Sequence, residues 1–149
     1  MYKLIYTILF LLLIIHNCNA DSKHIYSIGY VPICYHPGND SDYNDSTNGL
    51  FLSYDKWMVG TFTNSLYNQS FFIGRRFSTK YIYLFDKYIY GRANLYAGGL
   101  VGYGDRMINI AGIAPMAAPT IEIGHSNFSV EIMANMAVIS CMFKYTFEK

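Results

Sequence analysis

The chain has 149 residues, of which 52% are hydrophobic and 17% aromatic, and its formal net charge at pH 7 is +1. That length suits one domain, and a charge so close to zero without a basic stripe argues against a nucleic-acid partner. No Gly-rich phosphate loop, metal-spaced Cys/His set or internal repeat is present, so the sequence predicts neither a nucleotide nor a metal cofactor.

The first 20 residues have the features of a secretory signal peptide. Lys3 supplies the positive charge, and Leu4 to Ile15 form an apolar run of 12 residues. Cys18-Asn19-Ala20 then offers small residues at the two positions that signal peptidase recognises. The apolar run is too short for a spanning helix, which needs roughly 20 residues. We therefore expect cleavage after residue 20 and a mature domain of residues 21–149.

The remaining chain alternates with a period of two in several segments, which is the signature of β-strands. From Ile89 to Tyr103 one parity is wholly apolar or small, while the other contains Arg92 and Asn94. The 15 Tyr and 10 Phe residues also favour strands. The pattern predicts an all-β fold with eight strands, at about residues 25–36, 49–55, 57–63, 70–85, 88–103, 107–123, 127–135 and 138–147.

Export and strand length favour a membrane barrel. Several predicted strands have about a dozen residues or more, whereas strands of soluble proteins average about five or six. The ending Phe143-Lys144-Tyr145-Thr146-Phe147 resembles the aromatic terminus of outer-membrane barrels. Hydrocarbon cannot satisfy an open sheet edge, so the sheet must close. We predict a closed eight-stranded antiparallel transmembrane β-barrel that is monomeric. We expect it in the outer membrane of a Gram-negative bacterium, encoded by the cell or by a phage.

The connections between the predicted strands alternate in character. Short periplasmic turns and longer external loops are typical of such barrels. We expect both termini in the periplasm, beside tight turns at residues 55–56, 86–87 and 124–127. The external rim is then formed by residues 37–48, 64–69, 102–107 and 135–138.

Strand parity directs five charged side chains into the barrel: Arg76, Arg92, Glu122, Glu131 and Lys144. Two carboxylates and three cations can neutralise one another, as buried charges require. The plain interpretation is a structural ion-pair network. Arg75 breaks the pattern, because it shares parity with apolar residues, so either its side chain reaches toward the rim or the register changes there.

Three prolines, Pro32, Pro115 and Pro119, fall inside predicted strands, where each removes a ladder hydrogen bond. Two interpretations stay open. The prolines either open a gap through which a lipid chain enters sideways, or mark a bulge or edge-like loop.

Two cysteines, Cys34 and Cys141, remain after processing. Export exposes them to an oxidising compartment, where a disulfide can persist. The predicted first and last strands are neighbours in a closed barrel, so a disulfide across the closing seam is one option.

The external rim gathers residues that can activate a hydroxyl. His36 ends the first predicted strand, Ser65 lies in the second external loop, and Asp105-Arg106 lies in the third. A histidine, a serine and a carboxylate near one another are the components of nucleophilic catalysis. A rim histidine is more often simply solvated.

Four segments resemble the outer-membrane lipid A palmitoyltransferases, in the same order and at similar spacing. They are Ile33-Cys34-Tyr35-His36, Phe62-Thr63-Asn64-Ser65, the Pro-containing stretch from Ile108 to Gly124, and Met142 to Phe147. The resemblance covers about residues 33 to 147. It implies an eight-stranded barrel that moves an acyl chain from a phospholipid to lipid A, with membrane lipids as partners.

The resemblance also assigns roles to individual residues. It implies His36 as general base, Ser65 as the assisting or nucleophilic hydroxyl, and Asn64 as an oxyanion or orienting donor. Asn64 stands where the family has an essential Asp, so the carboxylate would come from Asp40, Asp42 or Asp105. Arg76 stands where the family has a Gly at the floor of its acyl pocket, and the family's preceding amphipathic helix is missing.

Two further functions stay open. A catalytically silent barrel would bind lipid or a partner protein through its loops, such as the acidic segment 37–48. A soluble periplasmic barrel would carry a lipid instead. For substrate contacts in the favoured acyltransferase, the candidates are Arg76, Pro32, Pro115 and Pro119.

Overall fold

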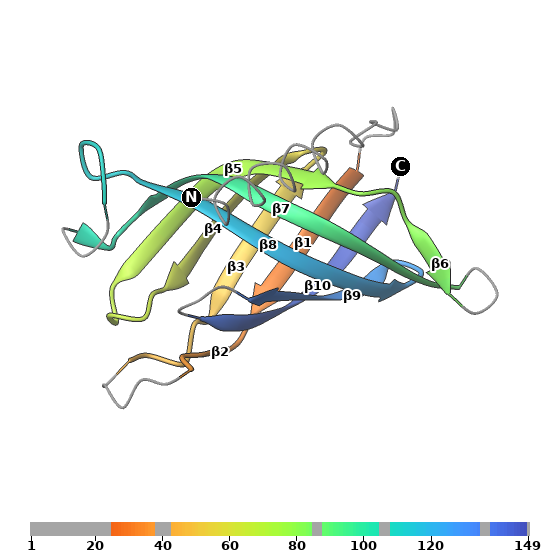
Figure 1. Cartoon of the computed structure of the whole chain (residues 1–149), viewed down its shortest axis with the longest axis horizontal. Helices are drawn as coiled ribbons and strands as arrows, with labels where there is room; N and C mark the ends of the chain where they lie inside the picture. The colour runs from red at the N-terminus through yellow and green to blue at the C-terminus, as the bar shows by residue number, and fades with distance from the viewer. Residues whose placement is uncertain (1–24, 38–42, 85–87, 105–107, 135–137, 149) are drawn as a thin grey trace, which may run out of the picture.

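The computed structural model describes residues 25–37, 43–84, 88–104, 108–134 and 138–148. The predicted signal peptide lies outside these residues. Within them the chain forms a single antiparallel sheet that closes on itself (Figure 1). The eight barrel strands are β1 (Ile25–Val31), β3 (Gly49–Tyr54), β4 (Trp57–Thr63), β5 (Gln69–Ser78), β7 (Ile89–Val101), β8 (Ala114–His125), β9 (Phe128–Ala134) and β10 (Ile139–Glu148).

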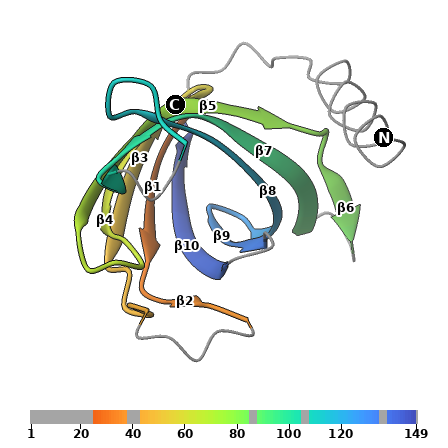
Figure 2. The ribbon, with the colours of Figure 1, turned by 60° about the vertical axis from the view of Figure 1, so that its left-hand side comes forward.

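Closure comes from pairing between the first and last strands. β1 pairs with β10 from Ile25↔Glu148 to Tyr30↔Phe143, and it pairs with β3 on its other side. Every other barrel strand pairs with its neighbours in chain order, so the sheet surrounds a common interior (Figure 2). The predicted all-β, closed eight-stranded antiparallel barrel is confirmed. None of the described residues forms a helix long and apolar enough to cross a membrane.

Two predicted strands are each divided in two. The predicted strand 70–85 is β5 followed by β6 (Ile82–Leu84), and both parts pair with β7. At the break the side chain of Thr79 replaces a backbone partner, because the Ala93 N–H donates to Thr79 Oγ1 at 3.0 Å. The predicted strand 25–36 is β1 followed by β2 (Cys34–Tyr35).

The predicted strand 107–123 was placed too early, because β8 begins only at Ala114. Before it the chain turns back on itself, with a bridge between Ile110 and Ile113. Ala111 and Gly112 occupy the left-handed region at the tip, with φ of 53° and 82°. That conformation is incompatible with a continuous strand.

A one-residue bulge separates β1 from β2. Tyr30 pairs with Phe143 of β10, yet the ladder resumes with Cys34 opposite Ser140, so β10 advances three residues while the first strand advances four. Pro32 lies in this interval and has no N–H to continue the ladder. A slip of one residue exchanges the faces of a strand. Cys34 therefore faces the interior, while Ile33 and Tyr35 are exposed on the outside.

The outside of the barrel is mainly apolar, whereas its interior holds both a charged and polar group of side chains and an apolar cluster. Its exposed outer side chains include Tyr26, Ile28, Leu52, Trp57, Ile73, Ile121, Ile132 and Phe143. Buried inside are Ser27, Ser70, Arg76, Asn94, Glu122, Glu131 and Lys144. Arg75 keeps the outward register, with its guanidinium 5.4 Å from the Trp57 ring centre and 5.8 Å from that of Phe77.

The two ends of the barrel differ. One end, which we call the turn end, carries the tight connection at residues 55–56 and the Ser126–Asn127 turn. The paired Ile25 and Glu148 lie beside these turns. The opposite loop end carries β2 and residues 43–48, 64–68 and 108–113. The described strands thus confirm that the barrel begins and ends beside its tight turns.

Candidate functional site

A cavity of about 740 Å³ occupies the barrel interior on the side of the loop end. Its wall is mainly apolar, with contributions from Val31, Phe62, Phe72, Leu100, Met116 and Met142. His36 and Ser65 also line it, near the loops. The volume lies within the roughly 300–1,000 Å³ that is usual for sites binding small ligands.

Ser65 sits in a tight turn that the Asn64 side chain holds together. Asn64 Oδ1 accepts hydrogen bonds from the backbone N–H groups of Leu66 at 2.8 Å and Asn68 at 3.0 Å. Its Nδ2 donates to Ser70 Oγ and to the Gly102 carbonyl, both at 2.9 Å. Asn64 is only 1% exposed, and its amide is fully used. The geometry thus makes Asn64 a positioning residue for the Ser65 turn.

A second loop is attached to this turn and to β2. Asn44 donates from its backbone N–H to the Ser65 carbonyl at 3.0 Å and from Nδ2 to the Asn64 carbonyl at 3.1 Å. The Cys34 N–H donates to the Asp45 carbonyl at 2.8 Å. These bonds carry Asp45 to the side of β2, beside His36.

His36 connects the two loops through both ring nitrogens. Its Nδ1 is 2.9 Å from Asp45 Oδ1, and its Nε2 is 2.7 Å from Ser65 Oγ. A carboxylate can only accept, so the neutral ring carries its proton on Nδ1 and leaves Nε2 to accept from the Ser65 hydroxyl. Serine, histidine and aspartate have the relative arrangement of a nucleophile, a base and an orienting carboxylate.

The His36 and Asp45 side chains differ in their exposure to solvent. The side chain of His36 is 8% exposed, whereas that of Asp45 is 64% exposed. Tyr43 stacks on the His36 ring, with centres 4.9 Å apart and planes at 21°. The imidazole is therefore held in place by packing as well as by its hydrogen bonds, while water screens the charge of Asp45.

Tyr103 lies beside Ser65, just after β7. Burial raises the pKa of the Tyr103 phenol above its ordinary value, its interaction with Ser65 works against that rise, and the nearby Cys34 adds to it. The phenol is therefore protonated at neutral pH and retains a hydrogen to donate next to the Ser65 hydroxyl.

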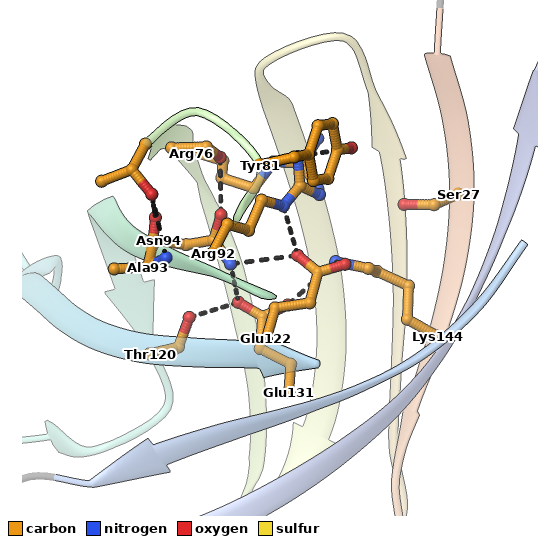
Figure 3. Close-up of polar contacts among 12 residues, drawn as sticks. Ser27, Arg76, Tyr81, Arg92, Ala93, Asn94, Thr120, Glu122, Glu131 and Lys144 are labelled. Carbon is orange, nitrogen blue, oxygen red and sulfur yellow. Dashed lines mark hydrogen bonds and ion pairs between the residues drawn. The ribbon is translucent and has the colours of Figure 1, made fainter. Parts of the chain in front are cut away.

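A network of charged side chains closes the cavity on the side of the turn end. Tyr96, Thr120 and Glu131 line the cavity. Tyr96 donates to Glu131 Oε2 at 2.8 Å, and Thr120 also donates to Glu131. Lys144 Nζ lies 3.0 Å from Glu131 and 2.8 Å from Glu122 (Figure 3).

The network continues away from the cavity. Arg92 Nε lies 2.6 Å from Glu122 Oε2, and Asn94 Nδ2 donates to both carboxylates. The inward placement predicted for all five charged residues is confirmed, and four of them form ion pairs. The remaining one, Arg76, does not line the cavity. Its guanidinium donates to the Asp55 carbonyl at 3.4 Å, near the turn end.

The prolines lie on the wall of the barrel. Pro115 and Pro119 are exposed on β8. Pairing between β8 and β9 runs only from Thr120 to His125, so within the described chain Ala114–Pro119 pairs with β7 alone. Ala117 is exposed outside and also lines the cavity. Pro32 marks the bulge that turns Cys34 inward.

The sequence predicted His36, Asn64 and Ser65 as site residues, but it did not identify the carboxylate that pairs with His36. The structure pairs His36 with Asp45. The candidates named from sequence, Asp40, Asp42 and Asp105, lie outside the described residues. Nothing in the sequence distinguishes Asp45 from the other acidic residues of its loop, because its position depends on the hydrogen bonds of Asn44.

The disulfide that the sequence allows does not form. Both Cys34 and Cys141 are free thiols. Cys34 lines the cavity, whereas Cys141 follows the cavity-lining Ser140 on β10 and so points to the other face. Two thiols on opposite faces of a sheet cannot approach bonding distance.

The sequence matches no protein-family model and no curated protein.

Proposed function

We propose that this chain is an outer-membrane acyltransferase that moves a fatty acyl chain from a phospholipid to lipid A. The observation that carries the proposal is the contact of His36 with Ser65 at 2.7 Å and with Asp45 at 2.9 Å, beside an apolar cavity. A serine activated in this way forms and breaks acyl esters. An apolar slot next to it suits a hydrocarbon chain.

The outer face of the barrel supports a membrane location. Aromatic and aliphatic side chains project from all sides of the sheet, while charges are buried inside. In water this arrangement would expose a large apolar surface, whereas in a bilayer it matches the usual lipid-facing band. The signal-like residues 1–20 are consistent with export to that membrane.

The interior supports binding of one acyl chain. Apolar side chains surround the cavity, and the network at Glu131 closes it, so its depth limits the length of the chain. The part of β8 from Ala114 to Pro119 has no described partner toward β9. Lipid could enter the cavity there without crossing the loops.

In the proposed first step, Ser65 Oγ attacks the ester carbonyl of the donor while His36 Nε2 takes its proton. The ester C–O bond breaks, His36 returns the proton to the leaving lysophospholipid oxygen, and an acyl-Ser65 ester remains. In the second step an acceptor hydroxyl of lipid A gives its proton to His36 and attacks that ester. Ser65 regains a proton from His36 as it leaves. Asp45 keeps the ring oriented throughout.

The direct test is mass spectrometry of lipid A from cells with and without the gene, with barrel insertion verified in both. We expect the mass of one added acyl chain in the expressing cells and a matching amount of lysophospholipid. Purified barrel with phospholipid but no lipid A should release free fatty acid slowly. If no acyl mass and no fatty acid appear from inserted barrel, the proposal fails and a lipid- or partner-binding role is favoured.

Substitution of Asp45 is expected to lower the rate of acyl transfer by a moderate factor. Asp45→Asn preserves shape but removes the charge that orients the His36 Nδ1–H. A buried triad aspartate contributes about 10⁴-fold to kcat. Asp45 is 64% exposed and its charge is screened, so we expect a smaller loss, about 10- to 100-fold in kcat with little change in KM. Initial rates of acyl transfer measure this.

Asp55→Asn is the matched control, because Asp55 lies in the turn between β3 and β4 at the opposite end of the barrel. Its kcat should stay within about twofold of the wild type. Equal losses in the two variants would assign the effect of Asp45 to general damage.

A further inference from the structure

The Cys34 side chain is a potential metal ligand that the acyl-transfer mechanism does not use. Cys34 Sγ, a ring nitrogen of His36 and a carboxylate oxygen of Asp45 lie within 4.8 Å of one another. Cys34 and His36 are partly buried and Asp45 is exposed, so the group lies at the boundary between the cavity and solvent. Its thiol donates to the Asn44 carbonyl at 3.4 Å, an ordinary distance for a sulfur hydrogen bond.

We propose that Cys34, His36 and Asp45 bind a zinc ion, and that the bound ion switches the serine site off. Thiolate, imidazole and carboxylate are the usual ligands of zinc. Ligand atoms around a tetrahedral zinc ion are roughly 3.5 Å apart. Small side-chain rotations therefore suffice to bring the three donors together, and water can occupy the fourth position from the exposed side.

The backbone already holds the three donors close together. The Cys34 N–H donates to the Asp45 carbonyl at 2.8 Å, which ties β2 to the loop that carries Asp45. Asn44 ties the same loop to the Ser65 turn. Binding therefore requires little ordering of the chain, which favours affinity. The sequence did not predict this site, because the third ligand, Asp45, comes from a separate loop.

The ion and the triad compete for the same imidazole. If zinc binds Nε2, it occupies the lone pair that accepts from Ser65. If zinc binds Nδ1, it displaces the proton there, and the neutral ring must carry its proton on Nε2. In both cases His36 can no longer accept a proton from Ser65. Binding also releases the thiol proton of Cys34 to solvent.

The test uses the folded full-length mature barrel in detergent micelles, titrated with Co²⁺ and then with Zn²⁺. Co²⁺ should give thiolate-to-metal charge-transfer absorption with one ion per chain, and Zn²⁺ should displace it. Cys34→Ala should remove the absorption and weaken Zn²⁺ binding by more than the roughly 10- to 100-fold that loss of an outer-shell partner costs. Cys141→Ala, the matched control, should bind as the wild type does.

Regulation is tested separately, and this part rests on the proposed acyl transfer. Zn²⁺ should inhibit the wild type and Cys141→Ala, with recovery on chelation. In Cys34→Ala, the same Zn²⁺ concentration should leave the rate close to that variant's own metal-free rate. Ser65→Ala should lose activity yet bind Co²⁺ normally, which separates failure of the metal site from failure of the enzyme.

The absence of a thiolate band in the wild type would overturn the proposal. So would its survival in Cys34→Ala or its loss in Cys141→Ala. If Cys34→Ala does not fold, as judged by circular dichroism, Cys34→Ser provides the same comparison with a near-isosteric side chain.

Discussion

Ser65→Ala is expected to lower acyl transfer by about 10⁴-fold or more, because it removes the nucleophile from the serine, histidine and aspartate group. His36→Ala should lose a similar factor, since it removes the base 2.7 Å from Ser65 Oγ. The two residues act as one unit. The double variant should therefore be scarcely slower than either single variant.

The measurement is single-turnover acyl transfer from labelled phospholipid, with folding verified for each variant. Ser140→Ala is the matched control, because Ser140 lines the same cavity from β10. It should retain at least about half of the wild-type rate. Losses in Ser65→Ala and His36→Ala that multiply in the double variant would contradict a shared catalytic unit.

Lys144→Met is expected to produce the largest loss of stability. Lys144 is 4% exposed and is the only residue with ion pairs to both Glu122 and Glu131 within the described chain. Without it, Glu122 keeps its ion pair with Arg92, whereas Glu131 has no ion-pair partner left among the described residues. Removing one partner of a buried ion pair costs about 3–5 kcal/mol. The free energy of unfolding should fall by that amount.

Urea unfolding in lipid vesicles measures this free energy, with Trp57, the one tryptophan, as the fluorescent reporter. Lys80→Met changes an exposed lysine and should stay within about 0.5 kcal/mol of the wild type. Adding Glu131→Gln to Lys144→Met removes one unbalanced charge and should recover part of the loss. Equal unfolding midpoints for Lys144→Met and Lys80→Met would show that the network does not support the barrel.

Much of the barrel could be predicted from sequence, because a strand alternates with a period of two wherever its faces meet different surroundings. The run from Ile89 to Tyr103 predicted β7 well, and parity alone directed Glu122, Glu131 and Lys144 inward. The start of β8 was wrong by seven residues. Apolar residues near Ile110 read as strand, while Ala111 and Gly112 turn the chain.

The candidate site could be predicted only in part. The resemblance at residues 33–36 and 62–65 pointed to His36 and Ser65, which lie at hydrogen-bonding distance. It also implied Asn64 as an oxyanion or orienting donor. The Asn64 amide is fully occupied in holding the Ser65 turn, so it orients that turn and has no hydrogen left for an oxyanion. The hydrogen-bond partners of a side-chain amide depend on which backbone groups other segments bring next to it, and sequence spacing does not contain that information.

The sequence by itself determined the all-β class, the number of barrel strands and the inward position of the charges, because each follows from local periodicity. Only the tertiary structure decided which face the end of the first strand presents. The bulge at Pro32 shifts the pairing with β10 by one residue and turns Cys34 inward. The tertiary structure also decided that Asp45 contacts His36, because that contact depends on hydrogen bonds between loops far apart in the chain.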